Sequence, residues 1–556
     1  MIALTAAEVT MEFNVASIFE RVAQNVPERE AIICGEARLT YGDFDRRANR
    51  MARYLASQGI GKGDHVAIYA YNRLEWVETM LACYKLCAVP ININYRYVEE
   101  ELYYLLNDAD VKAIVFERQF APLLAASKAS LPQLTTYVAI EDGSNAALDG
   151  LDAVDYATVA AQQSEEPLTV DRSADDLYVL YTGGTTGMPK GVVWRQEDVI
   201  MALGGGLDMG TGQPIASAEV MADRCIQPNA FPMRSLQLAP LMHGAAQWGA
   251  LRALLEGATV VLTDRKSFDA DNVWNTIGRE KVNVMLITGD AMARPLMDAL
   301  LEKEKRGEAY DLSSLFVIAS SAAIFSPSLK DAFSEKFPNA LVMDNIGASE
   351  VGYCGAAVHS KGGAEKDAGG PRVAPGPDIA VLDDDFNLIP LNSDREGWLA
   401  RGGNIPLAYY KDEEKTKKTY VTASDGKRYA IPGDKVRANE DGTLTLLGRG
   451  SLCINSGGEK IFPEEVEGAI KAHPAVVDTL VVGTPDERFG SCVTALVSIR
   501  PGFAEPTLES IQEACSKQIA RYKLPRRVFF VNEIARSPSG KPDYKWAKEE
   551  ALKRLA

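Results

Sequence analysis

The sequence predicts an α/β protein with a large N-terminal domain of several subdomains, residues 1–450, and a small α+β domain, residues 451–556. The chain has 556 residues, too many for a single hydrophobic core. Short apolar runs alternate with helical segments, which indicates mostly parallel sheets covered by helices. From about residue 372 the apolar runs lie among Gly, Asp and Pro, which favours antiparallel strands or a small β-barrel.

The first 60 residues are predicted to contain a helix, a hairpin over 30–39 and a second helix. Thr40-Tyr-Gly-Asp43 has the composition of a helix start, and Gly59 that of a helix end. Another helix is predicted over 76–87. The strands predicted beyond the hairpin are 64–69, 88–93, 113–116, 177–180, 259–262, 284–287 and 316–319.

The chain after Arg449 is predicted to form a compact unit of its own. The pattern indicates helices over 463–472 and 508–519 and strands over 478–482 and 493–499. A unit of about 100 residues has the size of a domain. We therefore place the domain boundary near residues 450–452.

Composition excludes several classes of function. The net charge of −17 argues against nucleic-acid binding, which needs a basic face, and it requires any anionic ligand to meet locally basic groups. The eight cysteines include no CxxC pair and there are four histidines, so we expect no metal cage and no disulfide framework. We see no signal peptide and no apolar run of about 18 residues. A cytoplasmic protein without a membrane span is expected.

The strongest chemical signal is the segment Tyr181-Thr-Gly-Gly-Thr-Thr-Gly-Met-Pro-Lys-Gly191. Glycines let successive N–H groups turn toward one anion, and the threonines and the lysine add donors and charge. The alternative is a plain Gly/Thr-rich turn between strands. The residues expected to hold a polyphosphate are Thr182, Gly183, Gly184, Thr185, Thr186, Gly187 and Lys190.

This segment, with its Pro-Lys-Gly ending, resembles the ATP loop of the adenylate-forming superfamily, which includes acyl-CoA synthetases, peptide-synthetase adenylation domains and luciferases. Further motifs in the family's order extend the resemblance over most of the chain. It implies a mobile C-terminal domain and the use of ATP, Mg²⁺ and coenzyme A. It also implies a small-molecule carboxylic acid as substrate, and leaves a homodimer open.

Two motifs resemble the family's acyl and adenine sites. Leu238-Ala-Pro-Leu-Met-His243 is similar to the floor of the acyl pocket, although His243 alone could be a core histidine. The missing acidic residue beside it favours a plain carboxylic acid over an amino acid. Ser321, Ala322 and Ala323 stand where small residues let adenine lie against the backbone, although a structural turn would look similar.

Asp344-Asn-Ile-Gly-Ala-Ser-Glu350 resembles the family's Tyr-Gly-x-Thr-Glu motif. The resemblance places Asn345, Gly347 and Ser349 at the nucleotide. It makes Glu350 a catalytic residue and the magnesium ligand, because a carboxylate suits a hard cation that bridges phosphates. The alternative for Glu350 is a solvated acid at a helix start.

Asp434 and Arg449 are the expected ribose partners. Asp434 can accept from two hydroxyl groups, and a predicted hairpin over 435–447 could bring both residues to one end. An exposed surface pair is the alternative, and such pairs contribute little.

The last motifs resemble the hinge, the thioester loop and the adenylation lysine of the family. Leu452 stands at the hinge, Gly457 and Gly458 could approach a pantetheine chain closely, and Lys460 falls near the acyl carboxylate. The alternative is a Gly-Gly turn before a helix. Lys541 lies on a Ser-Gly turn from which it can reach the carboxylate and the α-phosphate. With Glu350 and Lys190, it completes the predicted catalytic set.

These motifs predict an ATP-dependent acyl-CoA synthetase that forms acyl-AMP and then acyl-CoA. Two rivals are an adenylation enzyme that loads a carrier protein and a luciferase-like oxygenase. The glycines around Gly205 could keep the acyl pocket wide, although a surface loop is the alternative. The sequence of residues 453–465 resembles that of synthetases for isoprenoid or sterol side-chain acids. Together with these glycines it favours a medium-to-long or polycyclic acid.

Overall fold

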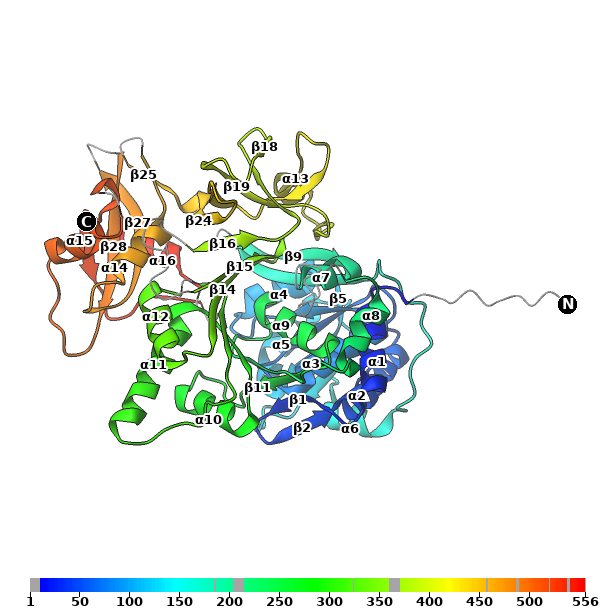
Figure 1. The fold of residues 1–556 in the computed structure, drawn as a ribbon. Helices are drawn as coiled ribbons and strands as arrows, with labels where there is room; N and C mark the ends of the chain where they lie inside the picture. The colour runs from blue at the N-terminus through cyan, green and yellow to red at the C-terminus, as the bar shows by residue number, and fades with distance from the viewer. Residues whose placement is uncertain are drawn as a thin grey trace. The chain divides into compact units, whose positions relative to one another are not determined.

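The computed structural model of the protein describes residues 11–184, 187–203, 215–323, 325–359, 371–456, 459–486, 490–519, 521–537 and 541–555 (Figure 1). The chain divides into two compact units. Unit 1 comprises Met1–Gly183, Met188–Ser267 and Pro406–Glu413, and unit 2 comprises Gly184–Gly187, Phe268–Ile405 and Glu414–Ala556. Among the described helices, none has the length and apolar character needed to cross a membrane.

Unit 1 contains a five-stranded sheet in the order β4-β3-β5-β6-β7. All four pairings are parallel, which confirms the sheet type predicted from the alternation. The core on this sheet includes Leu102 and Leu105 of α4 and Leu124 of α5. The strands are β3 (His65–Tyr69), β4 (Val89–Asn92), β5 (Val111–Glu117), β6 (Thr136–Ile140) and β7 (Val154–Asp155).

A second group of strands in unit 1 follows the order β10-β11-β1-β2. Strand β1 is parallel to β11 and antiparallel to β2. The predicted helix start is confirmed, because the Thr40 side chain accepts a hydrogen bond from the N–H of Asp43. The strands are β1 (Glu30–Cys34), β2 (Ala37–Thr40), β10 (Arg234–Gln237) and β11 (Thr259–Leu262).

The third sheet of unit 1 has the order β20-β9-β8 and comprises β8 (Leu177–Gly184), β9 (Gly187–Arg195) and β20 (Ala408–Tyr409). The helices of unit 1 are α1 (Val15–Asn25), α2 (Tyr41–Ser57), α3 (Leu74–Lys85), α4 (Glu99–Asp108), α5 (Ala121–Ser127), α6 (Tyr156–Gln162), α7 (Gln196–Ala202), α8 (Ala218–Asp223) and α9 (Gly244–Leu255). Helix α7 begins at Gln196, and the preceding Trp194 and Arg195 still belong to β9.

Unit 2 begins with parallel strands and continues with antiparallel ones. Strands β12, β13 and β14 are parallel neighbours, and an antiparallel series then runs β14-β15-β16-β24-β23-β19-β17-β18. The antiparallel strands predicted from the sequence beyond about residue 372 are therefore confirmed. These strands are β12 (Val284–Ile287), β13 (Val317–Ser320), β14 (Leu341–Ala348), β15 (Gly352–Val358), β16 (Arg372–Pro375), β17 (Ile379–Leu382), β18 (Leu388–Ile389), β19 (Arg395–Arg401), β23 (Asp434–Ala438) and β24 (Leu444–Arg449).

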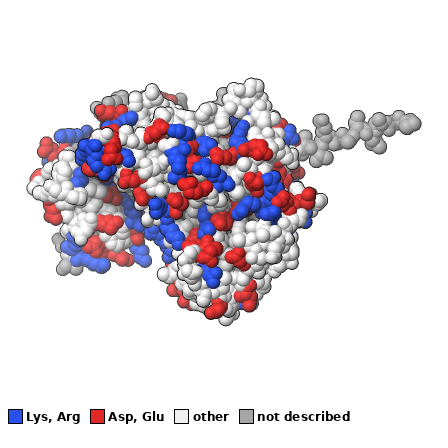
Figure 2. Space-filling view, turned by 90° about the horizontal axis from the view of Figure 1, so that it is seen from below, with Lys and Arg blue, Asp and Glu red and all other residues white. Residues whose placement is uncertain are grey.

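Two further strands, β21 (Tyr420–Thr422) and β22 (Arg428–Ala430), pair with each other, and β22 also pairs with β19. The helices of this part are α10 (Ala270–Glu280), α11 (Gly289–Lys305), α12 (Pro327–Lys336) and α13 (Glu413–Thr419). Figure 2 shows one face of the molecule, on which basic and acidic side chains are intermingled.

The C-terminal part of unit 2 has a three-stranded sheet, β27-β28-β29, with one apolar cluster that includes α14 and α15 and another that includes α16. Both clusters use only residues after Cys453, and the boundary near 450–452 stays a prediction. Sequence reasoning missed β29 and α16. The elements are β25 (Ile454–Ser456), β26 (Glu459–Ile461), β27 (Val476–Asp486), β28 (Gly490–Ile499), β29 (Arg527–Phe530), α14 (Pro463–Ile470), α15 (Leu508–Ser516) and α16 (Tyr544–Lys553).

Candidate nucleotide and acyl site

The predicted phosphate loop joins two hydrogen-bonded neighbours, β8 and β9. Thr185 and Thr186 lie outside the described residues, and the side chains of 183–187 are not described. Gly191 is required by close packing, because a Cβ there would lie 2.7 Å from the Tyr181 ring. The segment therefore begins and ends on paired strands, and its binding of a polyphosphate stays a prediction.

Lys190 lies on β9 beside an acidic residue that sequence reasoning missed. Its Nζ lies 3.4 Å from Oδ1 of Asp108 and 5.4 Å from the centre of the Tyr104 ring. The hydroxyl of Tyr181 donates to the other oxygen of Asp108 at 2.9 Å. Burial alone would lower the pKa of Lys190, but Tyr104 and Asp108 raise it. The lysine is therefore positively charged at neutral pH, as a phosphate ligand requires.

Two asparagines, the buried Asn92 and the half-buried Asn72, hold the segment before His243. Asn92, at the end of β4, donates to the carbonyl oxygens of Tyr181 at 2.8 Å and Met242 at 2.7 Å and accepts from the N–H of Tyr181 at 2.8 Å. Asn72 donates to the Ala239 carbonyl at 3.0 Å and accepts from the N–H of Leu241 at 2.7 Å. Asn92 therefore fixes the start of the phosphate loop against the predicted acyl segment.

Neither asparagine was predicted. Asn92 did carry a signal, because a polar residue at the carboxyl end of a predicted parallel strand is often placed for function. His243 is the N-cap residue of α9, and its carbonyl accepts from the N–H of Gln247 at 3.1 Å. Its contact with the acid stays a prediction. Gly205 and its glycine neighbours lie outside the described residues.

In unit 2 the predicted adenine motif follows β13, and most of the predicted magnesium motif lies on β14 itself. Ser320 of β13 and Asp344 of β14 are register partners in a parallel pair, so residues 321–323 leave β13 at the level where β14 continues with residues 345–348. Ala322 has φ +66°, a left-handed conformation that favours glycine. Such backbone strain is typical of functional turns, and it is consistent with the adenine role predicted for this turn.

Glu350 lies in the turn between β14 and β15, so the alternative of a helix-start acid is wrong. The buried Arg401 fixes this turn, donating through Nη1 to the carbonyls of Val351 at 2.8 Å and Tyr353 at 3.0 Å. Gly347 permits the close approach of the strands, because a Cβ there would lie 2.5 Å from the carbonyl oxygen of Gly352. Neither the Arg401 contacts nor this close approach was predicted.

Glu350 is the carboxylate that the sequence predicts as the magnesium ligand. The described residues include no group of three His, Cys, Asp or Glu side chains that could hold a metal ion. A lone carboxylate suits Mg²⁺ that keeps waters and binds phosphate oxygens. The described residues therefore fit a magnesium ion that arrives with the nucleotide, and Glu350 as its protein ligand stays a prediction.

The predicted ribose pair is supported by strand register. Strands β23 and β24 form an antiparallel hairpin in which Asp434 is the register partner of Arg449. The predicted hairpin is confirmed, and both residues lie at the same end of it. Their binding of ribose stays a prediction.

Lys541 closes a tight turn in the C-terminal part. The N–H of Ser537 donates to the Lys541 carbonyl at 2.7 Å, the N–H of Lys541 donates to Ser537 Oγ at 3.1 Å, and Arg536 bridges to Pro542. The Lys541 side chain is exposed. Lys460 lies on β26, and its side chain is outside the described part of the protein. Gly457 and Gly458 also lie outside the described residues.

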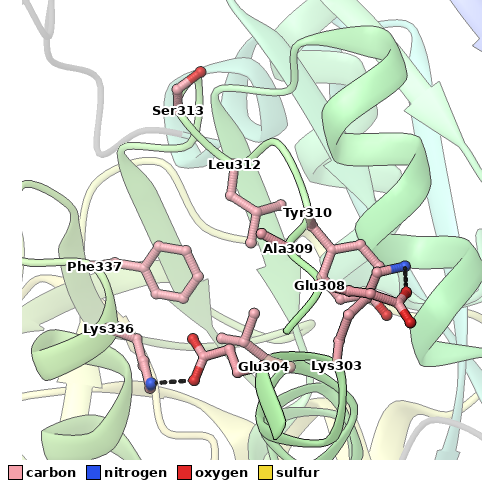
Figure 3. A pocket seen from close by; sticks show the side chains of 10 residues that line it. Lys303, Glu304, Glu308, Ala309, Tyr310, Leu312, Ser313, Lys336 and Phe337 are labelled. Atoms are coloured by element: carbon pink, nitrogen blue, oxygen red, sulfur yellow. Dashed lines mark hydrogen bonds and ion pairs between the residues drawn. The ribbon is translucent and has the colours of Figure 1, made fainter. Parts of the chain in front are cut away.

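A separate cavity of about 270 Å³ lies beside the C-terminal ends of α11 and α12 (Figure 3). Two of its cations already have partners, Lys303 with Glu308 at 3.7 Å and Lys336 with Glu304 at 2.5 Å. None of the residues predicted to bind nucleotide, acid or CoA lines it. We assign it no part in the site.

The order of these motifs agrees with known proteins. A family model described as AMP-binding enzyme matches residues 19–408, more than half of the chain. The chain belongs to the AMP-binding enzyme family. A second model, the AMP-binding enzyme C-terminal domain, matches residues 465–541.

Relatives of this AMP-binding enzyme extend over nearly its whole length. It is 48% identical to 3-oxocholest-4-en-26-oate–CoA ligase of Rhodococcus rhodochrous, over 98% of this chain and 97% of that one. It is 47% identical to a medium/long-chain-fatty-acid–CoA/3-oxocholest-4-en-26-oate–CoA ligase of Mycobacterium tuberculosis, with the same coverage. The solved structure of the anthranilate CoA ligase AuaEII with anthranoyl-AMP covers all of both chains with a TM-score of 0.83 and 23% identity, which shows a shared fold.

These findings confirm the predicted family, the fold class and the enzyme class. The AMP-binding enzyme is an acyl-CoA synthetase, an acid–thiol ligase whose family uses ATP, Mg²⁺ and coenzyme A. Its small-molecule acid substrate is likewise supported.

Proposed function

We propose that this synthetase activates a bulky or long carboxylic acid, either a steroid side-chain acid or a medium-to-long fatty acid. The observation that carries the proposal is the similarity, over 98% of the chain, to ligases named for these two kinds of acid. The proposed substrate class agrees with the class favoured by the sequence. The proposal excludes acetate-sized acids and amino acids as substrates.

In the first half-reaction the acid carboxylate attacks the α-phosphorus of ATP, and pyrophosphate leaves. Such in-line displacement depends on positioning and on neutralising charge. Lys190 would hold the β- and γ-phosphates, Asp434 and Arg449 the ribose, and Lys541 the carboxylate and α-phosphate. Magnesium held by Glu350 would supply neutralising charge on the phosphate oxygens.

In the second half-reaction the CoA sulfur attacks the acyl carbonyl, and AMP leaves. The C-terminal domain would turn about Leu452, withdraw Lys541 and bring in Gly457 and Gly458. These steps are carried over from the family resemblance. The exposure of Lys541 on a short closed turn supports such a role.

The role of Lys541 is tested by separating the half-reactions. Lys541→Ala should abolish acyl-AMP formation, measured as pyrophosphate release in a single turnover, and spare thioester formation from supplied acyl-AMP. Gly458→Leu should do the reverse. Equal loss of both half-reactions in Lys541→Ala would overturn the proposed role.

The acid class is tested with a panel of acids from acetate to steroid side-chain acids. A bulky or long acid should give the highest kcat/KM. Gly205→Leu should lower kcat/KM for bulky acids and spare short ones. The proposal fails if acetate or propionate is the best substrate.

Free CoA as the acceptor is tested by product formation with CoA and with a phosphopantetheinyl carrier protein. Faster transfer to the carrier protein would favour an adenylation enzyme that loads a carrier. Oxygen consumption or light emission would favour a luciferase-like oxygenase. A cytoplasmic location and a homodimer stay proposals. The spread of eight cysteines without a CxxC pair supports the former.

A further inference from the structure

A chain of buried and half-buried charges runs through unit 2, outside the residues proposed to bind substrates. Its centre is Lys471, which follows α14 and is 4% exposed. The Nζ of Lys471 lies 3.1 Å from Oδ1 of Asp478 on β27 and 3.4 Å from Oδ2 of Asp290 in the first turn of α11. One buried lysine therefore joins a carboxylate of the C-terminal part to a carboxylate of the preceding part.

Each end of this chain reaches a segment with a proposed role. At one end, Oδ1 of Asp290 accepts from the N–H of Ser326 at 2.8 Å, just after the turn at residues 321–323. At the other end, Asp478 accepts from Nε of Arg536 at 2.6 Å and from Nη2 at 2.8 Å. Arg536 begins the turn that carries Lys541.

Opposite charges offset the cost of burying these groups. Burial alone would raise the pKa of Asp478, but Lys471 and Arg536 hold it well below its usual value. Burial likewise opposes the charge on Lys471, yet Asp478 and Asp290 raise its pKa. A buried lysine that loses one of two carboxylates is left undercompensated, and such losses are larger than those of exposed pairs.

We propose that Asp290 is a positioning residue for acyl-adenylate formation. Through Lys471, Asp478 and Arg536 it ties the Lys541 turn to the turn proposed to hold adenine. These contacts thus fix the Lys541 turn relative to residues 321–323, and the Asp290–Lys471 contact must break before the C-terminal domain can turn. This inference rests on the proposed function, since it assumes that Lys541 acts in adenylation.

The test is Asp290→Asn in the full-length enzyme. Asparagine keeps an oxygen for the Ser326 N–H and removes only the charge that faces Lys471. Pyrophosphate release in a single turnover should fall about tenfold, because a small displacement of a catalytic group is costly. Thioester formation from supplied acyl-AMP should be unchanged or faster, and this also shows that the variant is folded.

Two further variants complete the experiment. Asp298→Asn removes an exposed carboxylate two turns along the same helix and should leave both half-reactions unchanged. Asp290→Asn combined with Lys471→Met should be no slower than Lys471→Met alone, because Lys471→Met already removes the contact with Asp290 along with the contact with Asp478. Additive losses would overturn the inference, as would an equal loss of both half-reactions in Asp290→Asn.

The Lys541→Ala variant separates this inference from the proposed function. If Lys541→Ala retains adenylation, the proposed function and the inference both fail. If Lys541→Ala loses adenylation while Asp290→Asn keeps the wild-type rate, only the inference fails.

Discussion

Replacement of Glu467 by Gln should stabilise the C-terminal part at pH 8 and have little effect near pH 4.5. Glu467 lies on α14 and is fully buried. Its Oε1 accepts from the N–H of Val481 at 2.8 Å, and its Oε2 from the hydroxyl of Tyr544 at 3.2 Å. Burial, reinforced by Glu464, raises the pKa of Glu467 from its ordinary value of 4.5 to about 8.

The sign follows from proton binding. Between pH 4.5 and about 8 the folded state holds a proton that the unfolded state releases, so stability falls as pH rises through this window. Each pH unit corresponds to about 1.4 kcal/mol, which gives about 5 kcal/mol across the window as an upper limit. Glutamine does not titrate and keeps an acceptor for Val481, so the variant avoids this loss.

The measurement is hydrogen–deuterium exchange of the peptide that covers β27, which contains Val481. Wild type and Glu467→Gln are compared at the same pH, so the intrinsic exchange rates cancel. At pH 8 the variant should exchange more slowly, by up to about a thousandfold, and near pH 4.5 the two should agree. Glu549→Gln, an exposed position on α16, is the matched control. A difference that does not change with pH would refute the raised pKa.

Three further substitutions test how the site is held. Gly347→Ala should destabilise the protein by about 2 kcal/mol and raise KM for ATP, because its Cβ would meet the Gly352 carbonyl 2.5 Å away. Its control is Gly468→Ala, where nothing lies within 4 Å of the added Cβ. The control should be neutral or stabilising in thermal unfolding. Asn92→Ala should lower kcat/KM for ATP and destabilise the fold by about 3 kcal/mol, because it leaves three backbone groups without their partner; unchanged kinetics would contradict its positioning role. Lys190→Met should raise KM for ATP about tenfold without changing thioester formation from supplied acyl-AMP.

Much of the fold was predictable because its signals are local. Strand β11 and strand β12 match the predicted ranges, since continuous apolar runs between helical segments are typical of buried parallel strands. The helix α16 was missed because its buried contacts come mainly from alanines, Ala547 and Ala551, which give no apolar periodicity. Its packing against β27 is a tertiary property.

The candidate site was predictable only where it follows a motif. The hairpin that pairs Asp434 with Arg449 was expected from sequence spacing, and its register bears this out. Asp108 and Arg401 could not be found in this way, and the place of Asn92 at a strand end indicated a role but not its partners. All three lie in other elements and act on backbone or side chains far away in sequence, and no local pattern marks such contacts.

The chain from Asp290 to Arg536 shows why such contacts matter for an enzyme of two half-reactions. Under the proposed function, Lys541 acts from an exposed turn and loses conformational entropy each time it is placed. Its position must then be set by the groups that hold this turn. Asp478 and Arg536 provide this support within the C-terminal part, and they cannot by themselves favour one orientation of the domain. Lys471 can, because its second carboxylate belongs to α11. A single contact of moderate strength suits this task, since a much stronger one would hold the domain in place after acyl-AMP has formed.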